Sequence, residues 1–489
     1  MAIQPATNRK MDELNAAFCD FYRCPEAFAT FTLIGKLSEG SGYFHFGPDT
    51  VCYGRTSPGF RAARATDELY DVGNDLVADG TTLGLPFNPS EISANLRYER
   101  YASKSDGPGT ASRAASALRA GYYLARPLLP VSVRKHLQRM RLNGWKKIAF
   151  PHWPVDTSVE RMFERLLISL LQVHSVERIP FIWFWPDGYP SCAIMTHDVE
   201  TARGRDFCPN LMDLDDAYAI KSSFQIVPEE RYSVSEAFLS AVRDRGFEIN
   251  VHDLNHDGGL VCDRQRFLQR AAQINRYGRA YRASGFRSAA LYRNLDWWED
   301  LEFSYDMSVP SVGNLEAQQG GCCSVMPFFV GKVLELPVTT VQDYSLFHIL
   351  NQYSIDLWVR QIALLSKQHG LLSFIVHPDY ISEPRAQDTY KSLLAYLADL
   401  RSEGKIWIAL PREVNQWWRD RSQMRLTRRG SNWEIEGPGS ERAQIAFAQL
   451  EGKSLVYRLD PGYGGGPTLP KVPCDGRWEN RNVSFNCLP

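Results

Sequence analysis

Apolar residues follow two different spacings in residues 191–410, and the two spacings alternate along the chain. Short apolar runs bounded by turn residues predict β-strands at 192–197, 222–227, 247–251, 303–308, 333–339, 372–377 and 406–410. Apolar residues three or four positions apart predict helices at 233–245, 263–276, 294–301, 355–369 and 387–402. This alternation predicts an α/β fold with a parallel sheet, and seven or eight repeats favour a barrel that is closed or nearly closed.

The flanking parts of the chain predict smaller units. Aromatic-rich alternation around a Gly-Pro-Asp turn predicts a hairpin across Tyr43–Tyr53, and a helix follows through Ser90–Tyr101 with Ser90 as its cap. Short alternating runs near the C-terminus predict antiparallel strands. The predicted segments are an N-terminal α+β unit at 1–105, a basic and helical connector at 106–184, a catalytic barrel at 185–411, a small β appendage at 412–460 and a Gly- and Pro-rich, poorly ordered tail at 461–489.

The composition is that of an ordinary globular protein and excludes several classes of function. The chain has 489 residues, of which 44% are hydrophobic and 23% charged, enough for two or three domains. A formal net charge of -1 gives no overall attraction to nucleic acid, so we expect no such partner. The N-terminus lacks the apolar core of a secretory signal, and no apolar run is long enough to span a bilayer. We therefore expect a cytoplasmic protein whose 10 cysteines are reduced.

The stretch from Gly107 to Val155 contains no acidic residue and many basic ones. Its apolar residues are interleaved with arginine and lysine, which leaves two interpretations open. In the first, residues 113–147 form a basic amphipathic segment in peripheral contact with the inner face of a membrane. In the second, the stretch is a connector whose apolar face packs on the next domain and whose arginines are solvated. We favour the connector.

Side chains that bind metal ions follow two of the predicted strands. Asp198 and Glu200 follow one strand, and His252 and His256 follow another. The carboxyl ends of parallel strands carry the catalytic groups of α/β barrels, so we expect these side chains to meet. Two imidazoles and one carboxylate make a three-ligand site for a catalytic divalent metal, provided that the chain turns helically between the histidines. His377, at the end of a later strand, strengthens the prediction of a site at this edge.

These residues belong to a series of motifs that resembles the polysaccharide deacetylase (NodB-homology) family of carbohydrate esterases. The resemblance covers about 185–410, less than half of the chain, and five motifs match in order and spacing. The matching segments are Thr196–Glu200, His252–His256, Gly285–Ala290, Tyr305–Asp306 and Ile375–His377. The resemblance implies an irregular (β/α) barrel of the NodB-homology type. Two positions depart from the family pattern: Val199 stands where a second aspartate is usual, and Ala289 replaces a proline.

The resemblance also implies a role for each residue. Asp198 is the general base, and Arg287 pairs with it and keeps it ionised. His252 and His256 are metal ligands. Glu200 is the third ligand, because some family members carry this carboxylate two positions after the base. If Glu200 points away from the histidines, Asp198 is the alternative ligand.

The remaining acidic residues and His377 complete these expectations. His377 is implied to be the general acid, with Asp306 as the residue that orients it. Four other aspartates are predicted to be cap, turn or surface residues: Asp213, Asp215, Asp216 and Asp257.

The implied activity is the metal-dependent removal of an N-acetyl group from a sugar or glycan. Zinc is the expected ion, and cobalt, nickel and manganese suit the same ligands. Two alternatives stay open. One is metal-dependent hydrolysis of a non-sugar C–N bond, such as a cyclic amide or ureide. The other is a non-catalytic glycan-binding role in a biosynthetic complex.

Overall fold

The computed structural model describes residues 14–59, 61–102, 140, 142, 144–430 and 432–460. The tail at 461–489 and nearly all of the basic stretch 113–147 lie outside these residues, so the predictions made for them stay untested. Among the described helices, none combines the length and the apolar character needed to cross a membrane.

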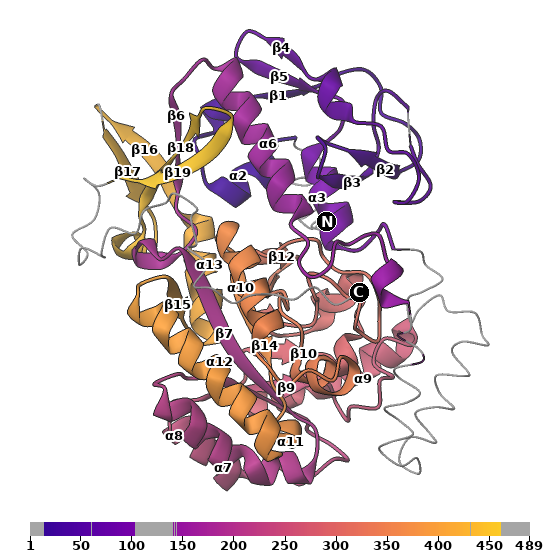
Figure 1. The fold of residues 1–489 in the computed structure, drawn as a ribbon, viewed down its shortest axis with the longest axis vertical. Coiled ribbons are helices and arrows are strands. Elements are labelled where there is room, and N and C mark those ends of the chain that lie inside the picture. Colours follow the sequence, from indigo (N-terminus) through magenta and orange to yellow (C-terminus); the bar gives the residue numbers. More distant parts are fainter. Residues whose placement is uncertain are drawn as a thin grey trace, which may run out of the picture.

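A curled sheet forms the centre of residues 191–410 (Figure 1). Its strands are β7 (Ser191–Val199), β8 (Ser223–Ile226), β9 (Glu248–His252), β10 (Gly285–Arg287), β11 (Tyr305–Asp306), β12 (Phe328–Val330), β13 (Val333–Glu335), β14 (Leu371–Ile375) and β15 (Ile406–Ile408). They lie in the order β12-β13-β11-β10-β9-β8-β7-β14, and β15 also pairs with β7. Every pairing is parallel except that of β12 with β13. The predicted α/β class with a parallel sheet is therefore confirmed.

The sheet has the shape of a half-barrel. Within the described residues, strand pairing ends at β12 on one side and at β14 on the other. The segment after β13 approaches β14 through side chains: the hydroxyls of Thr339 and Thr340 donate to the carbonyl oxygens of Leu371 and Ser373, each at 2.7 Å. The two sides of the sheet are thus joined here by side-chain hydrogen bonds.

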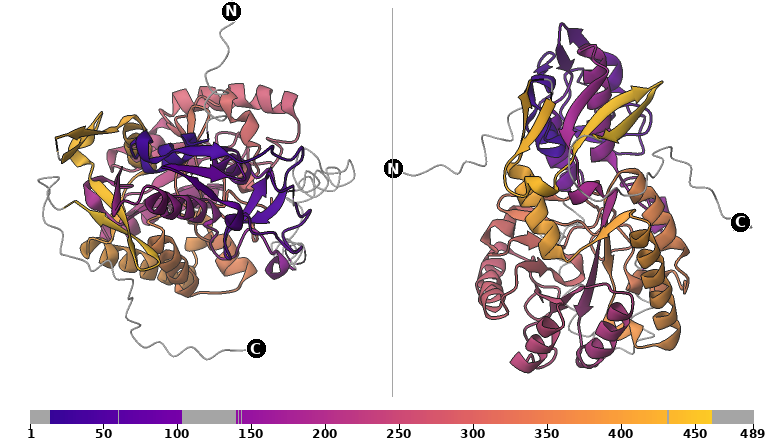
Figure 2. Two further views of the ribbon diagram at one scale, coloured as in Figure 1. Left: turned by 90° about the horizontal axis from the view of Figure 1, so that it is seen from above. Right: turned by 90° about the vertical axis from the view of Figure 1, so that its left-hand side faces the viewer.

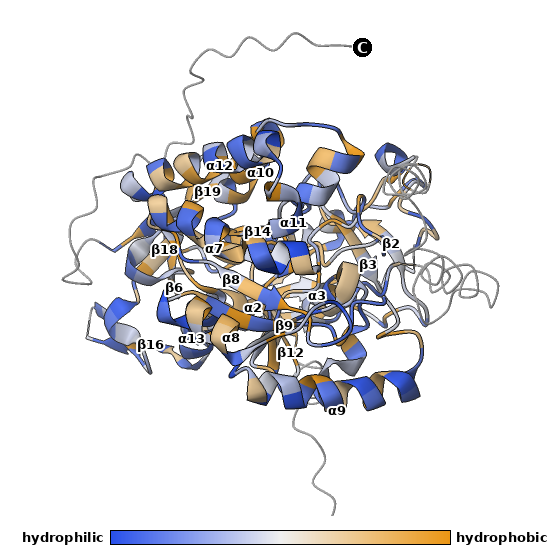
Figure 3. Ribbon diagram, turned by 90° about the horizontal axis from the view of Figure 1, so that it is seen from below, coloured by the Kyte–Doolittle hydropathy of each residue, from blue (hydrophilic) through white to orange (hydrophobic). Residues whose placement is uncertain are grey.

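Helices cover the outside of the sheet (Figure 2). They are α7 (Ala202–Ala217), α8 (Glu236–Asp244), α9 (Arg264–Ala280), the 3-10 helix η7 (Leu295–Asp300), α10 (Asp356–Lys367), α11 (Pro378–Ile381), α12 (Pro384–Ser402) and α13 (Pro411–Gln423). The side chains of Thr201, Ser235 and Asp263 accept hydrogen bonds from first-turn N–H groups and so start α7, α8 and α9. Figure 3 shows the mixed polar and apolar faces of α9 and α12, whose buried residues recur at helical spacing.

Helix α7 is one of the elements that the sequence pattern does not predict; strands β10 and β12 are others. Pro209 lies inside the helix, and its second half is rich in aspartate, so its apolar periodicity is weak. Its buried face nevertheless carries Leu211, Met212 and Asp215. This helix brings an acidic side chain beneath the sheet, which is important for the site described below.

The N-terminal and C-terminal parts of the chain pack together, at the opposite end of the molecule from α7 and α8 (Figure 1). Their elements are α2 (Ala16–Tyr22), β1 (Phe31–Leu33), β2 (Gly42–His45), β3 (Val51–Gly54), β4 (Val77–Asp79), β5 (Thr82–Leu85), α3 (Pro89–Arg97), α6 (Ser158–Val173), β6 (Arg178–Ile182), β16 (Arg425–Arg429), β17 (Asn432–Glu436), β18 (Ile445–Glu451) and β19 (Ser454–Leu459). Strands β2 and β3 form the predicted hairpin, with Tyr43 opposite Tyr53. Helix α3 is capped by Asn88 and not, as predicted, by Ser90, because Pro89 already occupies its first turn.

A buried arginine joins these parts to one another. Strand β18 pairs with β6 as well as β19, so a segment that precedes the central sheet and two that follow it share one small sheet. Arg421 of α13 donates from Nε to the Trp183 carbonyl at 2.9 Å and from Nη2 to the carbonyls of Phe21 and Ile182 at 2.9 and 2.7 Å. Its side chain is only 1% exposed. The guanidinium thus binds carbonyl groups from two segments, at Phe21 and at Ile182–Trp183, and joins both to α13.

Candidate metal and active site

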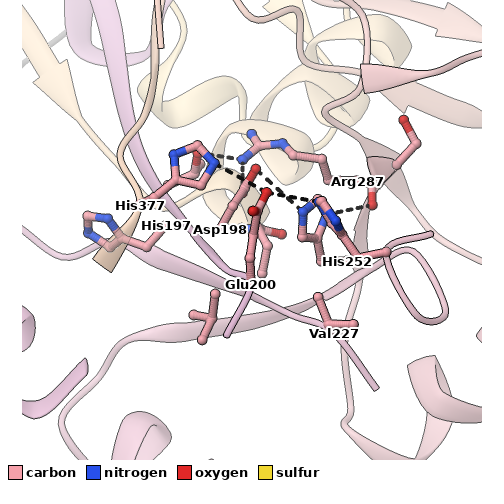
Figure 4. A network of polar contacts seen from close by, with 12 residues as sticks. His197, Asp198, Glu200, Val227, His252, Arg287 and His377 are labelled. Atoms are coloured by element: carbon pink, nitrogen blue, oxygen red, sulfur yellow. Dashed lines mark hydrogen bonds and ion pairs between the residues drawn. The ribbon is translucent and has the colours of Figure 1, made fainter. Parts of the chain in front are cut away.

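The register of the parallel strands brings several polar side chains to one edge of the sheet. Arg287, the last residue of β10, lies opposite His252, the last residue of β9. Ile375, the last residue of β14, lies opposite Thr196 near the end of β7. Figure 4 shows the side chains at these strand ends pointing toward one another. The predicted site residues that meet here are Asp198, Glu200, His252, His256, Arg287 and His377.

Glu200, His252 and His256 form the innermost cluster. One ligand atom from each lies within 4.8 Å of the other two. His256 Nε2 is 2.8 Å from Glu200 Oε1, and the two imidazole rings have centroids 4.8 Å apart. The chain between the histidines does not turn helically as predicted. Instead Asp253 and His256 both adopt a left-handed φ of 56°, and this irregular turn brings the two rings together.

These three side chains fit a divalent cation. The Nε2 atoms of both histidines are buried and form no hydrogen bond with any described residue, since the short contact of His256 with Glu200 lacks hydrogen-bond geometry. His252 Nδ1 donates to the Arg287 carbonyl at 3.1 Å, which leaves the lone pair on Nε2. Burial lowers the pKa of His252 to about 4, so the ring is neutral. Two imidazole nitrogens and a carboxylate oxygen are the donor set that zinc and similar ions prefer.

Both carboxylates of the site are held in the charged form. Burial raises the pKa of Asp198, but the charge of Arg287 outweighs it, so this pKa lies below its ordinary value. Burial likewise opposes the charge on Glu200, yet His256 and His377 bring its pKa well below the ordinary value. A cation placed between the histidines would therefore meet two anionic groups.

Asp198 is engaged by Arg287 on one side and faces the cluster on the other. Arg287 Nη1 donates to Asp198 Oδ1 at 2.5 Å and to Thr196 Oγ1 at 2.8 Å, and its Nε donates to the Met307 carbonyl at 2.9 Å. Asp198 Oδ2 lies 3.7 Å from His252 Nε2. Because Glu200 does point toward the histidines, Asp198 is free to serve a role other than that of the carboxylate ligand.

His377 is fixed by Asp343, a residue outside the five motifs. The backbone N–H and the ring Nδ1 of His377 donate to the two carboxylate oxygens of Asp343, at 2.7 and 2.6 Å. Burial lowers the pKa of His377, but the charge of Asp343 more than compensates and holds it well above the ordinary value. His377 Nε2 lies 3.6 Å from Glu200 Oε1, so the second ring nitrogen faces the cluster.

Asp306 does not orient His377, contrary to the prediction. Its Oδ2 accepts hydrogen bonds from Trp298 Nε1 at 2.8 Å and from the Ser308 N–H at 3.0 Å, and its Oδ1 accepts from the Ser308 hydroxyl at 2.7 Å. Strand β11 thus directs this carboxylate toward η7 and the following turn. No motif marks Asp343, which lies in the chain after β13 and reaches His377 only through the fold.

Of the four aspartates predicted to be cap, turn or surface residues, Asp215 differs. It is 0% exposed and accepts hydrogen bonds from His197 Nε2, Ser222 Oγ and Tyr390 Oη. Asp213 and Asp216 pair with Arg245 at the surface, and Asp257 pairs with two arginines of α9. The buried position of Asp215 follows from α7, the helix whose periodicity is too weak to be predicted.

Comparisons with known proteins concern the fold. No family model and no curated protein matches the sequence. Among solved structures, a putative polysaccharide deacetylase from Mycobacterium smegmatis is 16% identical, with a TM-score of 0.40, and the match covers 49% of this chain and 93% of that one. Puue allantoinase is 12% identical, with a TM-score of 0.36 and coverages of 48% and 92%. Peptidoglycan deacetylase PdaC from Bacillus subtilis is 9% identical, with a TM-score of 0.31 and coverages of 46% and 90%.

The matching structures thus include polysaccharide and peptidoglycan deacetylases, the same family as the resemblance of the five motifs. The matches cover about half of the chain, at low identity. At these values the similarity assigns no activity. Function therefore has to follow from the chemistry of the site.

Proposed function

We propose that the protein is a metal-dependent hydrolase that removes an N-acetyl group from a sugar or glycan. The observation that carries the proposal is the pair of buried Nε2 atoms of His252 and His256, which form no hydrogen bond and converge on Glu200. A buried polar atom without a hydrogen bond costs about 1–3 kcal/mol. Two such atoms beside one carboxylate support a cation held by these three residues. When bound, the cation supplies Lewis-acid chemistry to the acetyl carbonyl.

Two proton-transfer groups flank this position and differ in charge state. Asp198 is ionised through its pairing with Arg287, which suits it to accept a proton from the attacking water. His377 carries a raised pKa through Asp343, which suits it to donate a proton to the leaving amine. A base and an acid whose environments move their pKa values apart are typical of hydrolytic sites. Zinc is the ion expected here, and cobalt, nickel and manganese suit the same donors.

The choice of an N-acetylated sugar as substrate rests on the five-motif resemblance. The same base, acid and cation would also serve a cyclic amide or ureide, because the bond that breaks is again a C–N bond. Acetate release from N-acetylated oligosaccharides, measured beside ring opening of a cyclic ureide, separates these two activities. A glycan-binding protein without catalysis would give neither product.

The test of the metal centre measures the bound metal and the acetate release of the same protein preparations. We expect wild-type protein to retain about one divalent ion per chain, as three-ligand catalytic sites do. The double variant His252→Ala/His256→Ala should lose both the ion and acetate release. His152→Ala is the matched control, because this histidine side chain is 50% exposed and lies outside the cluster. Equal metal content in the wild-type protein and the double variant would refute the proposed centre.

A further inference from the structure

The peptide group that joins Val376 to His377 is held at both ends by buried side chains. The regular pairing of β14 with β7 ends at Ile375, after which the Val376 N–H still donates to the Thr196 carbonyl at 3.0 Å. The next carbonyl and the next N–H bind side chains instead. The Val376 carbonyl lies 2.9 Å from His197 Nδ1, and the His377 N–H donates to Asp343 at 2.7 Å. The backbone that carries His377 is therefore fixed by two residues outside the strand ladder.

His197 is well placed to hold this carbonyl because its ring is anchored on its other side. His197 is 0% exposed, and its Nε2 lies 3.0 Å from Asp215 Oδ2. Asp215 in turn accepts from the Ser222 hydroxyl at 2.6 Å and from the Tyr390 hydroxyl at 2.5 Å. Figure 4 shows the His197 ring pointing away from Asp198. The ring therefore contacts the support of His377 but none of the cluster residues.

His197 uses both of its ring nitrogens, each toward a different group. Nδ1 faces the Val376 carbonyl and Nε2 faces the Asp215 carboxylate. The ring also packs beside Phe224 and Tyr390, whose ring centroids lie 5.0 and 6.0 Å from its own. Of these contacts, the one with the Val376 carbonyl reaches the peptide group that carries His377.

We propose that His197 is a positioning residue for His377. Anchored by Asp215, it donates to the Val376 carbonyl and so fixes the direction in which the His377 ring leaves the backbone. The inference rests on the proposed function in one respect, the role of His377 as the general acid. The position of the His377 ring, however, can be measured without any substrate.

Two substitutions separate the two hydrogen bonds of the ring. The amide nitrogen of asparagine overlies Nδ1 of histidine, so His197→Asn keeps a donor for the Val376 carbonyl and loses the contact with Asp215. The amide nitrogen of glutamine overlies Nε2, so His197→Gln keeps the contact with Asp215 and leaves the carbonyl without a donor. We expect kcat for acetate release to fall about tenfold or more in His197→Gln, with KM and metal content unchanged, and to stay within about threefold of wild type in His197→Asn.

Thermal stability should follow the opposite order. His197→Asn leaves the buried carboxylate of Asp215 with fewer donors, so its Tm should fall more than that of His197→Gln. Ser222→Ala, which removes one donor from Asp215 but does not touch Val376, is the matched control and should lower Tm with kcat near wild type. If kcat and Tm fall together across all three variants, the role of His197 is only structural and the proposal is wrong.

A second measurement keeps the proposal testable if no substrate is turned over. In protein labelled with 15N-histidine, the ring signals of His377, assigned with His377→Ala, should shift in His197→Gln and stay in place in His197→Asn. Unchanged His377 signals in His197→Gln would overturn the proposal even if the enzyme were active. A wild-type protein that releases no acetate, together with the expected shifts, would instead refute the proposed function and leave the positioning role intact.

Discussion

Replacing Asp343 with asparagine tests the arrangement of His377 most directly. The carboxylate of Asp343 accepts three hydrogen bonds, from the His377 ring at 2.6 Å, the His377 N–H at 2.7 Å and the Tyr344 N–H at 2.7 Å. Asparagine offers one acceptor oxygen, and its NH2 group would face one of the remaining donors. At least one buried, charge-assisted hydrogen bond is therefore lost in Asp343→Asn, whichever way the amide is turned.

The size of the effect follows from that hydrogen bond. A hydrogen bond to a charged group contributes about 1.5–3 kcal/mol, and about 1.4 kcal/mol corresponds to a factor of ten. If the loss falls on the transition state, kcat should decrease about 10- to 150-fold, up to the lower end of the roughly 10²–10⁴-fold that general acid catalysis contributes. Because Asp343 contacts neither His252 nor His256, we expect metal content and KM to change little.

The assay is steady-state acetate release together with elemental analysis of the same preparations. The control is Asp306→Asn, since Asp306 is the residue that the sequence predicts beside His377 but that hydrogen-bonds with Trp298 and Ser308 instead. We expect this control to lower Tm while kcat stays near wild type. An Asp343→Asn enzyme with kcat within twofold of wild type, or a larger kcat loss in Asp306→Asn, would show that the reasoning about His377 is wrong.

Two further predictions concern stability. Arg421→Met removes the donors that bind three buried carbonyl groups. Each carbonyl costs about 1–3 kcal/mol when left without a partner, so the urea concentration at the unfolding midpoint should fall sharply. An unchanged midpoint would contradict the role of this arginine in joining the segments. Burial lowers the pKa of His369 to about 4, below the ordinary 6.5. Between about pH 4 and 6.5, this histidine therefore binds a proton in the unfolded chain but not in the native state. The free energy of unfolding should therefore fall as pH decreases from about 6.5 to 4. In urea titrations, His369→Asn should show a weaker dependence on pH than wild type. An equal pH dependence in both proteins would exclude His369 as the group responsible.

The residues on which the site is built could be recognised from the sequence because strand ends leave a local pattern. An apolar run followed by Asp198 or by His252 predicts a polar group at the edge of a parallel sheet, and this prediction needs only the neighbouring residues. The same local logic predicts the hairpin at Tyr43–Tyr53. It fails for α7, whose proline and aspartates mask the helical spacing, and therefore also for the buried position of Asp215.

The sequence by itself determined the α/β class, the order of most of the strands along the chain and the types of side chain placed at strand ends, because these depend on neighbours a few positions away. Only the tertiary structure decided which of these side chains meet. The partner of His377 is Asp343, 34 positions earlier in the chain, and the anchor of His197 is Asp215 on a helix outside the sheet. Such contacts depend on sheet register and helix packing, which are set by burial across the whole domain. The sequence around either residue therefore does not predict its partner.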